Sequence, residues 1–141
     1  MIVYAESSAV LAWLFRQPGG AQVQQILQAA GTIVSSDLTL VECDRAIHRE
    51  VAVRGLTRVA ARQLSADLRL EMSNWVVLAL TPAVVARARE PYPAEPIRSL
   101  DALHVAWALH AKSAETGVAI LSLDDRIRRV SASLGFELLP A

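Results

Sequence analysis

Four acidic residues in this chain could together bind a metal ion: Glu6, Glu42, Asp101 and Asp124. Each lies where a strand-like segment ends or on the helix that follows one. Because the carboxyl ends of parallel strands meet at one edge of an α/β sheet, acids that are distant in sequence can be gathered there. Carboxylates with few neutralising partners are the ligands that Mg²⁺ and Mn²⁺ prefer. The pattern therefore indicates metal-assisted chemistry, on the condition that the four side chains meet.

Each acid taken alone also has a structural explanation. Glu6 precedes a helix, whose positive end favours a carboxylate. Glu42 lies on a helix with arginines near its face, where a surface ion pair is expected, and Asp124 could cap the helix that it begins. Asp101 is the strongest candidate for chemistry, because its helix is apolar nearly all round and is therefore expected to be buried. A buried carboxylate needs a partner, a metal or a proton.

Strands and helices that alternate along the chain must position these acids. Strand-like segments are predicted at Ile2–Ala5, Thr32–Ser35, Trp75–Leu80, Gly117–Leu121 and Phe136–Leu139. Helices are predicted at about Ser7–Arg16, Ala21–Ala30, Leu38–Arg54, Thr57–Ser73 and Leu100–Ala111, with shorter ones from Pro82 and from Asp124. The alternation predicts an α/β fold: one domain of residues 1–141 with a mainly parallel central sheet flanked by helices on both faces.

Polar residues at the starts of these helices are predicted to cap them: Ser7 and Ser8 at the first helix, Thr81 before the short one, and Ser99 before the long apolar one. Ser8 is also suited to donate a hydrogen bond that orients a site carboxylate. Neither Ser7 nor Ser8 has a base placed to make it a nucleophile.

His104 lies one helical turn after Asp101, on roughly the same face. A metal ligand or general base is possible, but a hydrogen-bonded core histidine is the favoured interpretation. The single cysteine, Cys43, is interpreted as a small core residue rather than a nucleophile, and its solitude fits a reducing compartment. No HExxH, CxxC or P-loop pattern is present.

The overall charge excludes a protein that coats nucleic acid by bulk electrostatics, since 14 basic residues balance 14 acidic ones. Contacts to a phosphate backbone would have to come from metal ions or from local arginines. Arg126, Arg128 and Arg129, just after Asp124, are placed for such RNA-binding contacts. No apolar run approaches the about 18–20 residues that a membrane span needs, and no signal peptide is recognised, so a cytoplasmic protein is expected.

Five short motifs, in order, surround the candidate residues: Tyr4-Ala5-Glu6-Ser7-Ser8, Leu40-Val41-Glu42, Leu100-Asp101-Ala102-Leu103-His104, Ser122-Leu123-Asp124 and Gly135-Phe136. Each is weak alone. The ordered set resembles PIN-domain ribonucleases over the whole chain and at the usual length of that family. The most similar subgroup in size and pattern is the VapC-like toxins of bacterial toxin–antitoxin pairs.

The resemblance implies a metal-dependent endoribonuclease toxin that uses Mg²⁺ (or Mn²⁺). Glu6, Asp101 and Asp124 would bind the metal, directly or through water, and Glu42 would bind it or orient the attacking water. That water would cleave an RNA phosphodiester in line. A cognate antitoxin would bind over the site and neutralise the toxin, and the protein would be a homodimer.

Two positions depart from the family's usual pattern. Ser122 stands where Thr is common, and together with Ser8 it is expected to orient the carboxylates. Glu6 stands where Asp is normal, and its extra methylene moves the carboxylate by about 1.5 Å, when a misplacement of about 1 Å can cost about 10²-fold in rate. The pocket could have adjusted, the nuclease could be weakened, or the Glu could be an introduced attenuating change. Metal binding with reduced turnover is expected, and Glu6→Asp is expected to raise Mg²⁺-dependent cleavage.

Two other functions stay open at this point. One is a non-toxic PIN-like nuclease of RNA processing or decay. The other is a catalytically silent binding module in which the carboxylates are structural. A phosphoacceptor domain ranks lower, because Lys112 lies within a helix.

Overall fold

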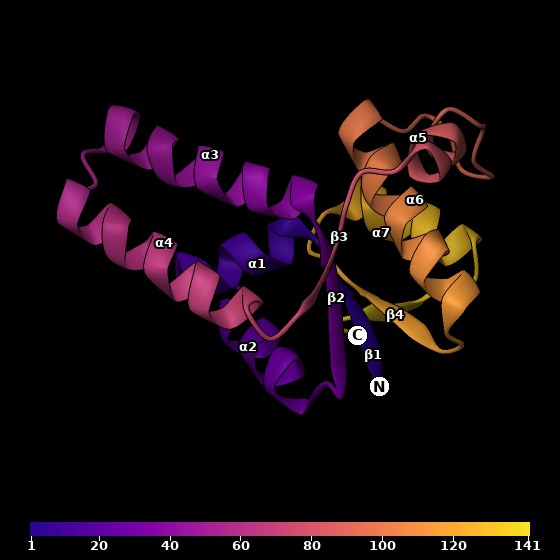
Figure 1. The fold of residues 1–141 in the computed structure, drawn as a ribbon, viewed down its shortest axis with the longest axis horizontal. Helices are drawn as coiled ribbons and strands as arrows, with labels where there is room; N and C mark the ends of the chain where they lie inside the picture. The colour runs from indigo at the N-terminus through magenta and orange to yellow at the C-terminus, as the bar shows by residue number, and fades with distance from the viewer.

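The computed structural model describes residues 1–141 and contains one five-stranded sheet between two groups of helices (Figure 1). The strands are β1 (Ile2–Ala5), β2 (Thr32–Ser36), β3 (Val76–Leu78), β4 (Val118–Leu121) and β5 (Glu137–Leu139). Every pairing is parallel, and the order across the sheet is β3-β2-β1-β4-β5. The predicted α/β fold with a parallel central sheet is therefore confirmed.

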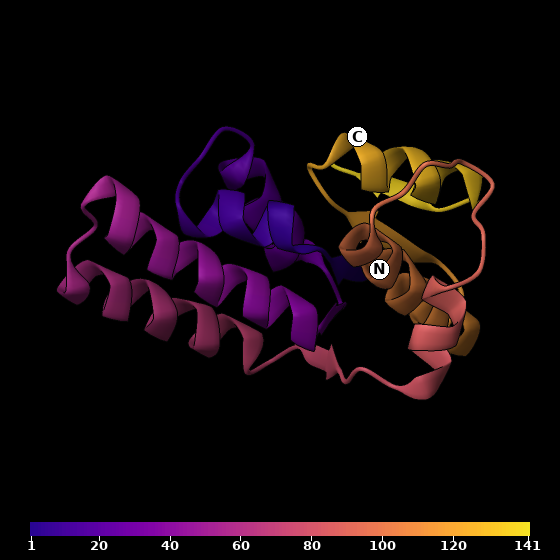
Figure 2. The same ribbon diagram turned by 90° about the horizontal axis from the view of Figure 1, so that it is seen from above.

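Helices cover both faces of the sheet, as the alternation predicted. One side carries α1 (Ser7–Leu14), α2 (Gly20–Ala29), α3 (Asp37–Arg54) and α4 (Arg58–Met72), and the other carries α5 (Pro82–Ala88), α6 (Ser99–Ala114) and α7 (Asp125–Ser133). Seen from above, α3 and α4 form a hairpin that extends well beyond the sheet (Figure 2). Gly55, at φ 73°, makes the left-handed turn that ends α3. None of the helices is long and apolar enough to cross a lipid bilayer.

The alternation of side chains along β1 divides the core into two layers. Val3 and Ala5 pack with residues of α1 to α4, whereas Tyr4 packs on the opposite face with residues of α6 and α7. Trp107 of α6 is buried in the Tyr4 layer, and its indole N–H donates to a backbone carbonyl. Cys43 is buried in the other layer, where burial raises the pKa of its thiol, so its predicted core role is confirmed.

The first helix is capped differently from the prediction. Its N-cap is Glu6, whose carboxylate accepts from the backbone N–H of Ser8, and Ser7 is already the first helical residue. The prediction that Ser7 and Ser8 cap the helix is therefore wrong, because the side chain of Glu6, the residue before them, caps it instead. The helix also ends earlier, at Leu14, and Arg16 takes a left-handed conformation at φ 53°.

Of the other two predicted helix caps, one is confirmed and one is wrong. Thr81 caps α5 as predicted, since its hydroxyl accepts from the backbone N–H of Val84. Ser99 does not cap α6, because Arg98 is the last extended residue and Ser99 already lies inside the helix, which has no side-chain cap.

The strand order makes the carboxyl ends of β1 and β4 the place where a site is expected. From β1 the chain passes along one face to β2 and β3, whereas β4 and β5 are joined along the other face. The helices that follow the neighbours β1 and β4 therefore leave on opposite sides, and ligands of α/β sheets bind at such switch points. Glu6 follows β1 directly, and Ser122 and Asp124 follow β4.

Candidate active site

Glu6 begins the site at the end of β1, and its side chain is buried with only 3% of its surface exposed. One carboxylate oxygen, Oε1, accepts from the Ser7 hydroxyl at 2.7 Å and from the Ser8 backbone N–H at 3.0 Å. The other, Oε2, accepts from the Ser8 hydroxyl and, at 2.7 Å, from the Ser122 hydroxyl. Four donors thus hold the carboxylate, and the reach to Ser122 on the neighbouring strand uses the extra methylene of Glu.

Ser8 and Ser122 tie this carboxylate to the loop after β4. Their hydroxyls lie 3.3 Å apart, and both donate to Glu6. The Ser8 oxygen accepts from the Leu123 backbone N–H at 2.9 Å, and the Ser122 oxygen accepts from the Asp124 backbone N–H at 3.1 Å. The two serines expected to orient carboxylates therefore bond to Glu6 and fix the loop that carries Asp124.

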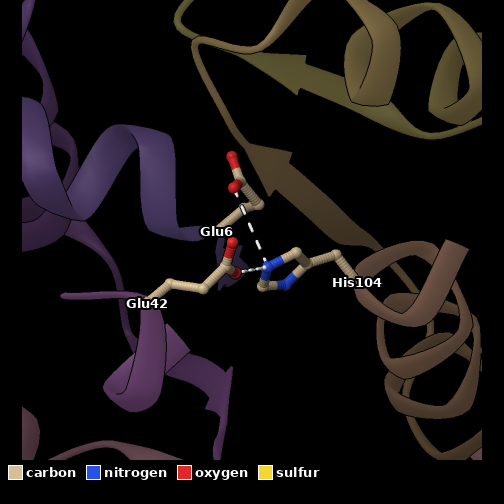
Figure 3. A group of neighbouring side chains, drawn as sticks. All are labelled: Glu6, Glu42 and His104. Carbon is tan, nitrogen blue, oxygen red and sulfur yellow. Dashed lines mark hydrogen bonds and ion pairs between the residues drawn. The ribbon is translucent and has the colours of Figure 1, made fainter. Parts of the chain in front are cut away.

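Glu42 lies on the second turn of α3, and its side chain points toward Glu6 and His104 (Figure 3). Its Oε1 makes a short contact with His104 Nε2 and lies 3.0 Å from the Ser7 hydroxyl, whose single proton Glu42 shares with Glu6. No ion pair joins Glu42 to Arg45. The surface ion pair that the sequence suggested for Glu42 is therefore wrong, because α6 supplies a nearer partner from the other side of the site.

His104 is buried, with 1% of its surface exposed, and is hydrogen-bonded on both ring nitrogens. Nδ1 lies 3.0 Å from the Tyr4 hydroxyl, and Nε2 faces Glu42 and lies 3.9 Å from Glu6 Oε1. The interpretation as a hydrogen-bonded core histidine is confirmed, with a partner that sequence reasoning missed. Glu6, Glu42 and His104 each offer one ligand atom within 4.8 Å of the others. Figure 3 shows these three side chains pointing toward one another.

Asp101 lies in the first turn of α6, beside this cluster, and is half-buried. Burial raises the pKa of its carboxyl, and the negative charges of Asp124 and Glu6 raise it further. The opposing effects of His104 and Arg126 are smaller, and no cation lies within ion-pair distance of Asp101. The sequence predicted a buried carboxylate; the side chain is less enclosed because the helix starts at the rim of the site.

Asp124 caps α7, the structural role that its position suggested. Its Oδ1 accepts from the backbone N–H groups of Arg126 at 2.8 Å and Ile127 at 3.2 Å. The cap uses one oxygen, and the other carboxylate oxygen is left for a further partner. The negative charge of Asp124 contributes to the raised pKa of the Asp101 carboxyl.

The donor set suits a hard divalent cation. The cluster consists of carboxylate oxygens with one imidazole, and no arginine or lysine is paired with its acids. The pKa of the adjacent Asp101 is raised by burial and by the charges of Asp124 and Glu6. The predicted metal ligands were Glu6, Asp101 and Asp124. The tightest grouping in the structure is instead that of Glu6 with Glu42 and His104, while Asp101 and Asp124 lie next to it.

The three arginines expected to contact RNA are not equivalent. Arg128 donates to the backbone carbonyls of Ser122 at 3.0 Å, Leu139 at 3.2 Å and Pro140 at 2.9 Å, so its guanidinium holds the end of the sheet together. Arg129 donates to a carbonyl in the loop before α6. Arg126 is exposed and has neither a salt bridge nor a side-chain hydrogen bond, and it is the one free to meet a phosphate.

An open groove of about 430 Å³ lies next to Glu42. Its walls come from α1, α3 and the start of α6, and its lining combines apolar side chains with two arginines and the site acid: Leu11, Leu38, Val41, Glu42, Arg45, Ala46, Arg49 and Leu100. Val41 and Leu100 are each about half exposed. The groove therefore offers apolar area and positive charge at the edge of the carboxylate cluster.

Residues 3–133 match the family model of the PIN domain. The chain is 32% identical over 106 residues to Ribonuclease VapC35 of Mycobacterium tuberculosis (strain CDC 1551 / Oshkosh), and the alignment covers 75% of this chain and 70% of that relative.

The fold is similar to those of two solved structures. One is Mycobacterium tuberculosis VapC20, a sarcin-ricin loop cleaving toxin, with a TM-score of 0.66, 16% identity and 95% of both chains covered. The other is VapBC2 of Rickettsia felis bound to a DNA fragment from its promoter, with a TM-score of 0.65, 14% identity, and 98% of this chain and 97% of that chain covered. At these identities the likeness concerns the fold.

Proposed function

This chain belongs to the PIN-domain family and is a VapC-like ribonuclease, and from that membership we propose that it is a metal-dependent endoribonuclease and the toxin of a toxin–antitoxin pair. The observation that supports the proposal is the close grouping of Glu6 and Glu42 with His104 at the carboxyl end of β1, beside Asp101, whose pKa the charges of Asp124 and Glu6 raise. The proposed unit is a single nuclease domain of residues 1–141, and a cytoplasmic location belongs to the same proposal.

Mg²⁺ or Mn²⁺ is the proposed cofactor, held by Glu6, Asp101 and Asp124 with Glu42 as a further ligand or as the residue that orients water. When bound, such an ion supplies Lewis-acid activation of a water molecule and neutralises charge on the scissile phosphate. The chain supplies the geometry. The serine hydroxyls hold Glu6 rigidly, and the raised pKa of Asp101 supports a site that carries more negative charge than its surroundings neutralise.

Glu6 is proposed to be a working member of this site and no defect in it. All four of its hydrogen bonds come from groups placed to meet a side chain of this length, including the Ser122 hydroxyl one strand away at 2.7 Å. Among the three explanations of this Glu, an adjusted pocket is therefore the one favoured. Preorganised carboxylates are worth more to catalysis than mobile ones, because small misplacements are costly.

RNA is the proposed substrate, and a cognate antitoxin the proposed partner. Arg126, exposed beside Asp124, is suited to a phosphate of the substrate. The groove beside Glu42 is suited to the apolar face of an antitoxin segment. Acidic side chains of the antitoxin would pair with Arg45 and Arg49, and one basic side chain of the antitoxin would lie among the carboxylates of the site. A homodimer is part of the same proposal.

The deciding experiment measures metal binding and RNA cleavage in the same preparations. Mn²⁺ titrated into the protein should release heat at one or more sites, and Mg²⁺ should support cleavage of total cellular RNA that EDTA stops. Asp101→Asn should reduce both, while Asp67→Asn, an exposed acid on α4, should change neither. Absence of Mn²⁺ binding together with unchanged behaviour of Asp101→Asn would instead identify a silent binding module.

A further inference from the structure

We propose that His104 is a positioning residue for Glu42, held in place by Tyr4, so that a Tyr4–His104–Glu42 relay keeps the Glu42 carboxylate inside the site. The inference rests on the proposed function, because it concerns how one of the proposed site acids is aimed. Its core is geometric: the imidazole lies between a core hydroxyl on one side and a site carboxylate on the other. Figure 3 shows the His104 ring reaching from α6 to Glu42 on α3.

Glu42 needs a positioning residue because a neighbour on its own helix favours an outward conformation of its side chain. The side chain is 29% exposed, and Arg45, three residues further along α3, is exposed and lines the same groove. Residues at this spacing are neighbours on a helix surface, and a Glu–Arg pair there is ordinarily favourable. Glu42 instead points inward, where His104 and Ser7 are its partners. The inward conformation therefore depends on contacts from other elements.

The ring of His104 must present a proton to Glu42. A carboxylate only accepts hydrogen bonds, so the nitrogen in contact with Glu42, Nε2, is a donor. Glu6 Oε1 at 3.9 Å adds a second negative group on the same side. A ring flipped about its axis would turn a C–H toward Glu42, and the contact would be lost. The orientation of the imidazole thus decides whether the carboxylate is held.

Tyr4 fixes that orientation from the other side. Its hydroxyl lies 3.0 Å from Nδ1 and donates to the Ser36 hydroxyl at 3.2 Å. Tyr4 has no exposed surface, and burial raises the pKa of its phenol, so the group stays a neutral hydroxyl. The contacts of Tyr4, His104 and Glu42 join β1, β2, α6 and α3, and they anchor a partly exposed acid to the buried centre of the sheet. Partners of this kind, which orient a metal-binding group, typically change metal affinity or activity about 10–100-fold when they are removed.

Five variants and two controls test the relay. His104→Leu removes the donor, His104→Gln keeps an amide N–H in a similar place, and Tyr4→Phe removes only the hydroxyl that orients the ring. Glu42→Gln and the double variant Glu42→Gln/His104→Leu complete a cycle. The controls are His110→Leu, an exposed histidine on the same helix, and Tyr92→Phe, a buried tyrosine whose hydroxyl donates to the Ala102 carbonyl.

The expected result is selective. His104→Leu should weaken Mn²⁺ binding and lower kcat about 10–100-fold with KM for RNA little changed, and His104→Gln should recover part of the loss. Tyr4→Phe should show a smaller loss in the same direction. His104→Leu should add nothing in the Glu42→Gln background, whereas both controls should keep wild-type Mn²⁺ affinity. Nitrogen NMR of the metal-free protein should find His104 Nε2 protonated.

Three results would overturn the proposal. They are wild-type Mn²⁺ affinity and kcat in His104→Leu, an effect of that substitution that adds fully to Glu42→Gln, or an unprotonated Nε2 in wild-type protein. If His104→Leu does not fold, Tyr4→Phe and His104→Gln carry the comparison. A wild-type protein that neither binds Mn²⁺ nor cleaves RNA would refute the proposed function, while the NMR measurement would still decide the state of the relay.

Discussion

Glu6→Asp is the most informative single substitution, because sequence and structure predict opposite signs for it. From sequence alone, Asp restores the usual residue of the family and should raise activity. In the structure, the Glu6 carboxylate is bonded to Ser122 Oγ at 2.7 Å and to Ser7 Oγ at 2.7 Å. Shortening the side chain withdraws the carboxylate by about 1.5 Å. The Ser122 contact would then exceed hydrogen-bond length, so we now expect a loss.

The size of that loss follows from the bonds at risk. Hydrogen bonds to charged groups contribute about 1.5–3 kcal/mol each, and the buried Ser122 hydroxyl can partly compensate by turning to Ser8 Oγ at 3.3 Å. A net loss of about 2 kcal/mol is expected, or roughly 4–8 °C in Tm for a domain of this size. Displacement of one site carboxylate should also lower kcat on the order of 10–100-fold.

The assay compares wild type, Glu6→Asp and Glu90→Asp in thermal unfolding, Mn²⁺ calorimetry and Mg²⁺-dependent RNA cleavage. Glu90 is exposed in the loop after α5 and serves as the matched control for a Glu-to-Asp change. Glu6→Asp should be worse in all three measurements, and Glu90→Asp should match wild type. Equal or higher cleavage by Glu6→Asp, with an unchanged Tm, would refute the argument and return Glu6 to the role of an attenuating residue.

Four further predictions concern Asp101, two arginines and the effect of Mn²⁺. In metal-free protein the pKa of Asp101 is raised in the folded state, so its contribution to stability is present at low pH and is lost as pH rises through the folded-state pKa. Asp101→Asn should therefore raise the Tm of metal-free protein at neutral pH. When Tm is measured at decreasing pH, this difference from wild type should disappear as Asp101 becomes protonated. A lower Tm of Asp101→Asn at neutral pH would contradict the prediction. Arg128→Ala should lower the free energy of unfolding by about 2–3 kcal/mol, because the guanidinium donates to three backbone carbonyls, and should leave Mn²⁺ affinity unchanged. Arg126→Ala should leave Tm unchanged and raise KM for RNA. Saturating Mn²⁺ should raise Tm, with about 2.7 kcal/mol of stabilisation at 100 times Kd, and Asp101→Asn should abolish most of that gain, as differential scanning calorimetry can measure.

The fold was largely predictable because its signals are local. A short apolar segment indicates the strand at Ile2–Ala5, and a glycine that can adopt the left-handed conformation indicates the helix end at Gly55. Parallel pairing then follows from alternation of strands and helices. The caps of α1 and α6 were less predictable, because a shift of one residue at the helix start changes which side chain faces the free N–H groups.

The sequence predicted which strand ends carry the candidate acids, but it did not predict the contacts of their side chains. Glu6 and Asp124 fall at strand ends, so the topology brings them to the same edge. The pairing of Glu42 with His104 joins residues 62 positions apart, and it depends on how α3 and α6 lean over opposite faces of the sheet. Nothing in the local sequence distinguishes that contact from a surface pair with Arg45. The contact of Tyr4 with His104 was not predicted for the same reason. The sequence indicates only that Tyr4 packs in the core, and the structure is needed to place its hydroxyl beside His104.

The way in which this site satisfies its acids has a consequence for metal binding. Glu6 is held by hydroxyls and a backbone N–H, which donate hydrogen bonds but bring no full positive charge. Arginines at the same positions would neutralise the carboxylates and compete with a divalent ion. The imidazole of His104 contacts Glu42 and lies 3.9 Å from Glu6, and Asp101 has no cation within ion-pair distance. Under the proposed function, the serine hydroxyls fix the geometry of Glu6 and leave its charge available to a divalent ion, and His104 is proposed to orient Glu42 toward the same site.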